Sequence, residues 1–367
     1  MMKTLRVAII GQGRSGRGIH AKHIVTQPRK YRIVVAVDPI KERREWAAAN
    51  LGCDVHATHK PVLKRNDIDL VVNATPSPLH GSVSCEFLKA GFNVLCEKPL
   101  ARTVREADRV IAAAKKSGKV FAIYQQSRFA AYYRQVAKVV QSGVLGRVVQ
   151  ISIAFNGFAR RWDWQTLTER YGGNLLNTGP HPLDQALRFL DIPVSETPEV
   201  FCHMDRAHFC GNAEGHVNLI LRAPGRPLIN LEISSCCTFP CYTYNLYGTQ
   251  GGLKGGMSEM AWRYFKPSEA PKRRALTTPL RDKDGVPIYC GESLKWYEKK
   301  WTVPPSKRDL FAATGAAFYN NLYNHMTKGE PLEVTPDQVR QQIAVIEECH
   351  RQNPNIWGNV VKRGRKR

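Results

Sequence analysis

The sequence predicts an α/β protein whose first part is a doubly wound parallel sheet and whose remainder is a second α/β domain. Three observations carry this prediction: an apolar run at residues 5–10 enters a glycine-rich turn, further apolar runs alternate with stretches long enough for helices, and 367 residues suffice for two domains. A chain with 43% hydrophobic and 23% charged residues has the composition of a globular protein.

The glycine-rich turn is the strongest local motif. Residues 5–10 form a short strand, and Gly11, Gly13 and Gly16 follow in a G-x-G-x-x-G pattern that also contains Arg14 and Ser15. The first glycine allows a sharp turn, the second allows backbone to approach a pyrophosphate, and the third allows close packing of the helix on the strand. This order predicts a dinucleotide site.

A second strand at residues 33–37 ends in Asp38, close to the separation at which an acidic residue binds the adenosine ribose. A carboxylate there accepts hydrogen bonds from the ribose hydroxyls and repels a 2′-phosphate, which favours NAD over NADP. Arg14, Lys41, Arg43 and Arg44 leave NADP as the alternative, because one of them could hold that phosphate. The structural alternative for Asp38 is a solvated acid at a strand end.

Further strands at residues 69–74, 93–96 and 120–124 complete a first domain that ends near residue 125. Ligands of such sheets lie at the carboxyl ends of the strands. Thr75, Pro76 and His80 follow one strand, and Glu97 and Lys98 follow the next. We therefore expect these residues beside the cofactor.

The chain resembles the glucose-fructose oxidoreductase/inositol dehydrogenase/rhizopine catabolism (Gfo/Idh/MocA) family over nearly its whole length. The motifs that carry the resemblance are the glycine turn ending in Gly16, Thr75-Pro76, His80, Glu97-Lys98-Pro99, Arg128-Phe129, residues 143–147, residues 172–184 with Asn177, His181 and Asp184, Gly248-Thr-Gln-Gly251, Gly329-Glu-Pro-Leu, and a final helix at about 336–351.

The resemblance implies a Rossmann domain at 1–125 and a second domain at 126–352 for substrate binding and oligomerisation. Its large, mostly antiparallel open sheet forms the floor of the substrate site and often an oligomer interface. The resemblance also implies a homo-oligomer, a dimer or tetramer, and the final helix can pack back on the first domain. Alternating apolar residues at 148–155, with strand-like runs at 216–221 and 229–233, suit such a sheet independently.

Oxidation of a secondary alcohol needs a base beside the hydroxyl and a positive charge near the developing alkoxide. The resemblance assigns Lys98 to the hydroxyl and the nicotinamide ribose; a solvated lysine is the alternative. His181 stands at the start of a helix at 182–190, where the helix dipole favours neutral imidazole, unless Asp184 faces the ring. The alternative for His181 is a helix cap.

Asn177 stands where the family commonly has aspartate. An amide cannot accept a proton, so we expect Asn177 to orient a substrate hydroxyl and His181 to transfer the proton. The departure puts the family's two-residue proton relay in doubt.

Residues 160–164, Arg-Arg-Trp-Asp-Trp, combine the aromatic faces and charged groups that bind sugars. We expect Arg161, Trp162, Asp163 and Trp164 to contact substrate together with Arg128. The alternatives are tryptophans that pin a loop to the core and an ion-pairing role for Arg128.

The formal charge of +23 raises nucleic acids, membrane surfaces and anionic substrates as partners. Part of it belongs to a basic tail, residues 353–367, whose Lys362, Arg363, Arg365, Lys366 and Arg367 we expect to be solvated. No DNA-binding or RNA-binding signature is visible, and no apolar run reaches the roughly 18 residues of a membrane span. We expect neither a specific nucleic acid nor a membrane as partner.

Ten scattered cysteines fit a reducing cytoplasm. Cys236, Cys237 and Cys241 lack the spacing of a zinc site and lie in or beside an expected strand at 229–239, so we expect buried, inert thiols and no metal.

The sequence therefore predicts an NAD-dependent dehydrogenase of a sugar, glycoside or cyclitol. Three alternatives stay open: redox-assisted elimination or glycoside cleavage with retained NAD, a cofactor-sensing regulatory protein on the same fold, and an oligomeric scaffold with incidental nucleotide binding.

Overall fold

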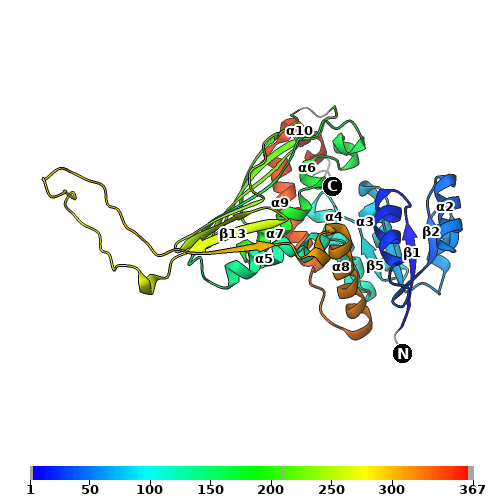
Figure 1. Cartoon of the computed structure of the whole chain (residues 1–367). Coiled ribbons are helices and arrows are strands. Elements are labelled where there is room, and N and C mark those ends of the chain that lie inside the picture. The colour runs from blue at the N-terminus through cyan, green and yellow to red at the C-terminus, as the bar shows by residue number, and fades with distance from the viewer. Residues whose placement is uncertain (1–2, 208–209, 363–367) are drawn as a thin grey trace.

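Two sheets organise the chain. The computed structural model describes residues 3–207 and 210–362, which form a six-stranded parallel sheet followed by an eight-stranded, mostly antiparallel sheet (Figure 1). The predicted fold class is confirmed.

The first sheet has the strand order β3-β2-β1-β4-β5-β6, the order of a doubly wound dinucleotide-binding sheet. The edge strand β3 was missed, because its three residues are only half-buried or exposed and pair with β2 alone. The bounds are Leu5–Ile10 (β1), Tyr31–Val37 (β2), Asp54–His56 (β3), Leu70–Asn73 (β4), Val94–Cys96 (β5) and Phe121–Ile123 (β6).

Helices cover both faces of this sheet. The segment after the glycine turn, η1 (Gly16–Ala21), is a π-helix that continues into α1 (Lys22–Ile24). The other helices are α2 (Lys41–Leu51), α3 (His80–Lys89) and α4 (Val104–Ser117), of which α3 and α4 pack on each other. Short turns of 3₁₀ helix lie at Lys60–Lys64 (η2), Ser77–Leu79 (η3) and Gln126–Phe129 (η4).

The second sheet has the order β14-β13-β12-β11-β7-β10-β9-β8, and only β7 and β10 pair in parallel. The predicted strands at 148–155, 216–221 and 229–233 are β7, β9 and β10. The bounds are Val148–Asn156 (β7), Glu199–Asp205 (β8), His216–Arg222 (β9), Leu228–Ser234 (β10), Tyr244–Gly248 (β11), Gly251–Gly255 (β12), Glu259–Tyr264 (β13) and Tyr297–Thr302 (β14).

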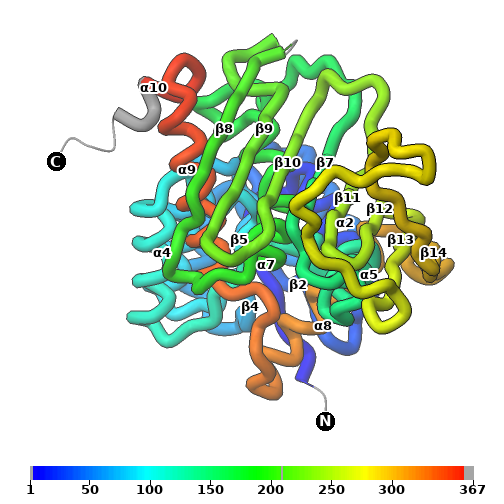
Figure 2. The backbone as a smooth tube through the Cα atoms, turned by 90° about the vertical axis from the view of Figure 1, so that its left-hand side faces the viewer, coloured from blue at the N-terminus to red at the C-terminus, as the bar shows by residue number. Residues whose placement is uncertain are grey.

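One face of this sheet is covered and the other is open. The helices α5 (Ala131–Gln141), α7 (Pro180–Leu190) and α9 (Pro336–Gln352) lie between the sheet and the first domain, and their apolar side chains form a second core (Figure 1). Figure 2 shows the opposite face. The short elements α6 (Asn174–Asn177), η5 (Trp164–Thr166) and η6 (Thr168–Arg170) lie in the connections.

The C-terminal part ties the two cores together. Helix α8 (Leu310–Lys328), preceded by η8 (Pro305–Lys307), buries Tyr319 and Leu322 in the core of the first sheet. Helix α9 contributes Ile343 to the first core and Ile346 to the second. The boundary near residue 125 stays a prediction, since chain far beyond it packs on the first domain.

The expected tail from residue 353 is wrong for its first part. Residues Pro354–Lys362 form the helix α10, whose Trp357 is fully buried. The Trp357 ring stacks on His350 at 3.9 Å between centroids, and its Nε1 donates to Glu214 Oε2 at 3.1 Å. Residues 354–361 carry no charge, and Ile356 packs on the second core beside Trp357. Residues 363–367 lie outside the described residues.

The expected burial of three cysteines is also wrong. Strand β10 ends at Ser234 and not near residue 239, so Cys236 and Cys241 lie exposed in the following loop and Cys237 is half-buried. Within the described ranges, no group of three His, Cys, Asp or Glu side chains could hold a metal ion. No helix there is long and apolar enough to cross a membrane.

The connection between β13 and β14 leaves the body of the protein entirely. Residues 265–296, which include η7 (Pro267–Glu269), project as a long, thin excursion (Figure 1). Loops of this length without regular structure are uncommon in compact domains and are usually functional. The sequence analysis did not single it out.

Glu214 supplies a pH test of the packing around α10. Burial raises the pKa of this carboxyl to about 7, although hydrogen bonds from Leu175 N and Trp357 oppose the rise. A raised folded-state pKa means that the folded protein binds a proton that the unfolded chain releases, so stability falls as pH rises from about 4.5 through 7. Relative to Glu214→Gln, the wild type should lose about 3 kcal/mol of unfolding free energy over that window. Urea denaturation at each pH measures it, and parallel profiles would refute it.

Candidate active site

The predicted cofactor residues meet at one edge of the first sheet. The last residues of β1, β2, β4, β5 and β6 lie level in register, so the segments that follow them emerge side by side. These segments begin at Gly11, Asp38, Ala74, Glu97 and Tyr124. The N-terminus of α7 approaches the same edge from the second domain, because the side chain of Gln125 binds Pro180.

The three glycines of the turn have different reasons to be glycine. Gly11 has φ of +98°, and a Cβ there would lie 2.4 Å from Ala74 O; a Cβ at Gly16 would collide with Gly11 O. Gly13 is different, since the nearest atom to its Cβ would be Arg43 Nη1 at 3.8 Å. Folding therefore requires Gly11 and Gly16, while the open backbone at Gly13, between Gln12 and the exposed Arg14, fits an approaching pyrophosphate.

Gln12 is a second sign of a ligand at this turn. Its side chain is 2% exposed, and in the described part of the chain neither amide atom has a hydrogen-bond partner. Buried polar groups are normally paired, so an unpaired amide beside an open glycine fits a dinucleotide that completes the site. The sequence analysis did not select Gln12. Ser15, which it did select, is half-buried in the same turn.

Asp38 is fixed by backbone hydrogen bonds and is not a loosely solvated acid. Its Oδ2 accepts from Gln12 N at 2.8 Å and its Oδ1 from Ile40 N at 2.9 Å, and the residue is 2% exposed. Arg43 Nη1 lies 3.4 Å from Oδ2. The carboxylate that favours NAD and a guanidinium that could favour NADP therefore stand side by side.

His80 acts within the protein. Its ring nitrogens lie 2.7 Å from Pro99 O and 2.8 Å from Thr75 O, and burial lowers its pKa. The ring thus joins the Thr75-Pro76 segment to the Lys98-Pro99 segment, whose connecting peptide is cis. The structure supports a positioning role for His80 and leaves Thr75 and Pro76 nearer the cofactor edge.

Glu97 also faces inward. Its Oε2 accepts from Lys98 N at 3.0 Å, and its Oε1 lies 3.0 Å from His20 Nε2, while His20 Nδ1 contacts Tyr319 Oη at 2.7 Å. Burial alone would raise the pKa of Glu97, but His20 and the Lys98 charge lower it to about 2. Glu97 is therefore an anion that supports Lys98 from behind.

Lys98 reaches from the first domain to the second. Its Nζ donates to Asn177 O at 2.7 Å. Burial lowers the pKa of Lys98, Glu97 opposes that shift, and the charges of Arg14 and Arg161 add to it. The ammonium is thus held in a positive environment, where it gives up a proton more readily than a solvated lysine does.

His181 lies opposite Lys98 at the start of α7. Its Nδ1 is 3.2 Å from Ser127 Oγ. Burial lowers its pKa to about 3, the Lys98 charge adds to the shift, and Glu97 opposes it. The imidazole is therefore neutral near pH 7, and its Nδ1 is hydrogen-bonded to Ser127. The positive charge of Lys98 thus disfavours a second positive charge on His181.

Asn177 is tied to the segment that was expected to bind substrate. Its Oδ1 accepts from Gln165 Nε2 at 3.1 Å, and Arg161 donates to Gln165 and, at 2.6 Å, to Asp163. Gln165 was missed because nothing in the sequence distinguishes it from any other loop glutamine.

The two tryptophans of this segment project into solvent. Trp162 is 80% exposed and Trp164 is 48% exposed, and Arg160 beside them is exposed as well. This geometry disfavours the alternative in which both indoles pin the loop to the core. Their faces remain free for a ligand.

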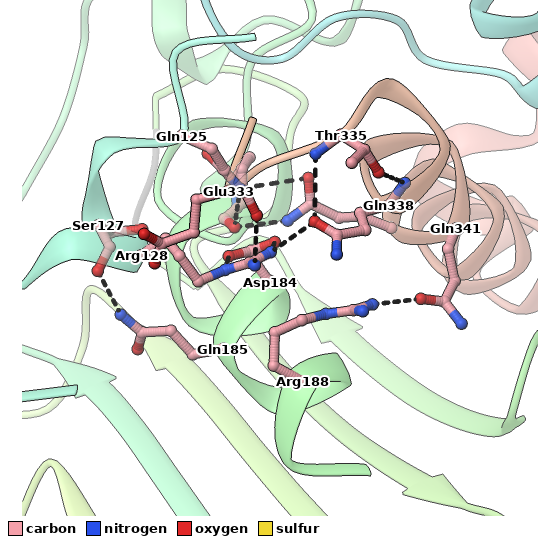
Figure 3. A network of polar contacts seen from close by, with 12 residues as sticks. Gln125, Ser127, Arg128, Asp184, Gln185, Arg188, Glu333, Thr335, Gln338 and Gln341 are labelled. Carbon is pink, nitrogen blue, oxygen red and sulfur yellow. Dashed lines mark hydrogen bonds and ion pairs between the residues drawn. The ribbon is translucent and has the colours of Figure 1, made fainter. Parts of the chain in front are cut away.

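Arg128 needs a correction. The residue is 5% exposed, and its guanidinium holds Asp184 on α7 in a bidentate ion pair with both contacts at 2.6 Å (Figure 3). It also donates to Glu333 O at 3.3 Å and to Gln338 at 3.4 Å. With its donors turned to these partners, Arg128 supports the ion-pairing alternative and not substrate binding. The pairing also turns the Asp184 carboxylate toward Arg128.

Two further residues support the start of α7. Ser127 contacts His181, and Gln125 and Gln342 both donate to Pro180 O. Gln125 and Ser127 follow β6 directly, so the rule that selected Thr75 and Lys98 could have found them. Gln342 comes from α9, far away in the sequence, and carries no comparable signal.

Comparisons with known proteins identify the family of the chain. Residues 5–125 match a family model described as "Oxidoreductase family, NAD-binding Rossmann fold", and residues 133–254 match the "GFO/IDH/MocA C-terminal domain". A 2,7-anhydro-N-acetylneuraminate hydratase of Mediterraneibacter gnavus is 28% identical over 95% of this chain and 94% of its own length. The scyllo-inositol 2-dehydrogenase (NADP(+)) IolW of Bacillus subtilis is 25% identical over 94% and 92%.

Solved structures show the same fold. The WlbA dehydrogenase from Bordetella pertussis, in complex with NADH and UDP-GlcNAcA, has a TM-score of 0.73 at 20% identity, with 95% of this chain and 96% of that chain covered. GenD2 from gentamicin A biosynthesis, in complex with NAD, has a TM-score of 0.72 at 20% identity and covers 100% and 96%.

The Arg128 pair predicts a large loss of stability. Arg128→Met leaves the Asp184 carboxylate buried and uncompensated, which should lower the free energy of unfolding by about 3–5 kcal/mol. The matched control is Arg134→Met, because the ion pair of Arg134 with Glu333 is exposed; it should cost less than about 1 kcal/mol. Urea denaturation at pH 7 compares them. Equal losses would show that Asp184 does not depend on Arg128.

Proposed function

Because the chain belongs to the Gfo/Idh/MocA oxidoreductase family, we propose that it transfers a hydride between NAD and a secondary alcohol of a sugar, glycoside or cyclitol. The observation that carries the proposal is the position of Lys98, bound to Asn177 O in the second sheet's domain and close enough to His181 to lower its pKa, beside the edge of the first sheet that holds the open glycine turn.

The residues at that edge fit a dinucleotide. Gly13 presents bare backbone, the amide of Gln12 is buried without a partner, and Asp38 is fixed where a ribose would lie. Thr75 and Pro76 follow the neighbouring strand. When bound, the nicotinamide ring accepts or returns the hydride.

In this proposal Lys98 stabilises charge on the substrate oxygen, and His181 accepts the proton of the hydroxyl. The Lys98 ammonium, steered by Asn177 O, holds the oxygen and stabilises the negative charge that grows on it as the hydride leaves. His181 has one nitrogen engaged by Ser127, which leaves the other to take the hydroxyl proton. Because burial and the Lys98 charge make His181 a weak proton acceptor, the proton passes on to solvent and does not accumulate on the ring.

The loop at 160–165 supplies the sugar contacts in this proposal. The exposed faces of Trp162 and Trp164 can pack on the apolar face of a ring, and the Arg161-Asp163 pair can bind its hydroxyls. Gln165 connects this loop to Asn177, so substrate binding and the position of Lys98 are coupled.

A second candidate function keeps the cofactor and returns the hydride. In such a reaction a transient ketone acidifies a neighbouring C–H bond, elimination or addition follows, and NAD is not consumed overall. Two observations favour it as the alternative: Asn177 replaces the carboxylate common in the family, and the M. gnavus relative is named a hydratase. Turnover without added NAD distinguishes it from net oxidation.

Two properties of the protein in the cell stay predictions. The family resemblance suggests a dimer or tetramer. Ten free cysteines, several of them exposed, fit a reducing cytoplasm.

Cofactor preference depends on Asp38. Asp38→Ser removes the ribose acceptor and the repulsion of a 2′-phosphate while Arg43 remains, so the ratio of NADP to NAD affinity should rise at least about 10-fold. Calorimetric titration with each nucleotide measures the ratio. Glu42→Ser, a neighbouring exposed acid, is the matched control and should leave the ratio unchanged. An unchanged ratio in Asp38→Ser would refute the assignment.

The catalytic assignment predicts two inactive variants. Lys98→Met and His181→Ala should each lower the rate of nicotinamide reduction by about 100-fold or more, because each removes a group that touches the reacting hydroxyl. The assay follows absorbance with NAD and a panel of inositols, free sugars and glycosides.

Lys89→Met and His325→Ala, which change exposed or partly exposed residues away from the site, are the controls. Activity that survives in both active-site variants would contradict the assignment. The protein could bind nucleotide, fail to reduce NAD with any alcohol of the panel, and still convert a substrate without added NAD. That result would favour the retained-cofactor reaction. Binding alone, with neither activity, would favour a sensing role.

A further inference from the structure

The segment between β13 and β14 is the most unusual feature of the fold. We call residues 266–296 the arm. All 31 of its residues are described, and all except Ala270, Leu280 and Leu294 are exposed. Figures 1 and 2 together show that it projects away from the first domain, on the side of the open face of the eight-stranded sheet.

The base of the arm is fixed by contacts between its two legs. Glu269 on the outgoing leg accepts from Tyr297 Oη at 2.8 and 2.7 Å and forms an ion pair with Lys295 at 3.1 Å. Lys266 pairs with the same carboxylate at 3.3 Å. On the adjoining strand Arg263 stacks on Trp296. The arm therefore leaves the body in a defined direction.

The tip is a formed turn. Ile288 N donates to Leu280 O at 3.0 Å, Asp282 N donates to Val286 O at 2.9 Å, and Gly285 has the φ of +81° that such a turn needs. A turn that is ordered before binding loses less conformational entropy when a partner covers it.

The arm exposes apolar side chains that no described residue of its own chain covers. Leu276 is 61% exposed, Val286 55%, Ile288 48% and Tyr289 99%. Apart from the bridge between Arg281 and Pro287 the arm has no strand pairing, and scattered apolar residues on a projecting loop cannot bury one another. These side chains gain stability only against a second surface.

The position of the arm selects a second copy of the chain as that surface. A hollow of about 670 Å³ lies at its foot on the open sheet face, lined by Tyr247, Arg263, Trp296 and neighbouring residues. Phe201 and Tyr247 are exposed by 61% and 50% on strands of that sheet. A copy related by a twofold axis that faced this side would lie in the path of the arm, and each copy would meet the other's arm.

The length of the arm is sufficient for this contact. Each leg has roughly 15 residues and spans at most about 50 Å when extended. Two packed sheets lie about 10 Å apart, so an arm that starts on one sheet passes the facing sheet and reaches the helices behind it.

We propose that residues 266–296 form an intersubunit clasp, in which the arm of each copy lies along the other copy and buries Leu276, Val286, Ile288 and Tyr289 against it.

The charge of the arm argues against a polyanion as its main partner. Lys272, Arg273 and Arg274 are basic, but in the turn Asp282 and Asp284 are balanced by Arg281 and Lys283, so the turn has no net charge. Membrane-binding and nucleic-acid-binding tips present an excess of basic residues where the contact forms, and this turn has no such excess.

The first test is the mass of the full-length protein in solution by sedimentation equilibrium. The wild type should sediment at a multiple of 41.3 kDa. Ile288→Asp with Tyr289→Asp should raise the dissociation constant by about 10-fold or more, and replacement of 268–294 by a short glycine-serine link should do at least the same. Phe311→Asp, an equally exposed apolar residue on α8, is the control and should leave the constant unchanged. Circular dichroism checks that each variant is folded.

The second test asks what the arm touches. A photo-crosslinker in place of Tyr289, in a mixture of ¹⁴N-labelled and ¹⁵N-labelled protein, should yield crosslinked peptides that join the two labels. The proposal is overturned if crosslinks stay within one copy, or if the arm variants associate as strongly as the wild type. It is likewise overturned if the protein is monomeric and the arm variants lose binding only to RNA or to acidic vesicles.

Discussion

The buried ion pair between Arg128 and Asp184 is the contact on which the site depends. It joins the segment after β6 to α7, and Arg128 also holds Glu333 O and Gln338 at the start of α9. Three segments from distant parts of the sequence thus have one fixed arrangement. A buried pair of this kind adds little net stability over apolar packing, but a mismatched arrangement would leave a charge unpaired. Its contribution is therefore to specify where α7 begins.

The start of α7 in turn determines the electrostatics of the site. His181 lies at the start of α7, where it contacts Ser127. Lys98 extends from the first domain toward the same place and donates to Asn177 O. Glu97 keeps an anion behind Lys98, while Arg14 and Arg161 add positive charge in front. Burial and the Lys98 charge both lower the pKa of His181, so its imidazole stays neutral near pH 7. The distinct roles that we propose for the two residues follow from their positions.

Local rules explain what the sequence could predict. The glycine turn, Asp38 and Lys98 were found because strand ends in a parallel sheet share an edge, and this rule also reaches Ser127. This rule could not predict contacts between segments that are distant in the sequence. The sequence does not distinguish an arginine that binds a substrate carboxylate from one that pairs with Asp184. Helix α10 was predicted to be a tail because the basic residues from Lys362 onward drew attention away from the uncharged stretch before them, which contains Trp357. The arm escaped notice because its residues follow no period.

Asn177 shows how one neutral residue changes the chemistry of the site. A carboxylate at this position would compensate part of the positive charge that Arg14, Lys98 and Arg161 supply, and it would make His181 a stronger base. The amide does neither; it binds Gln165 and leaves the excess charge in place. Such a site stabilises negative charge on the substrate more than it promotes removal of a proton. Enolate and alkoxide intermediates benefit equally from that field, which is why the same residues suit both net oxidation and a cycle that returns the hydride.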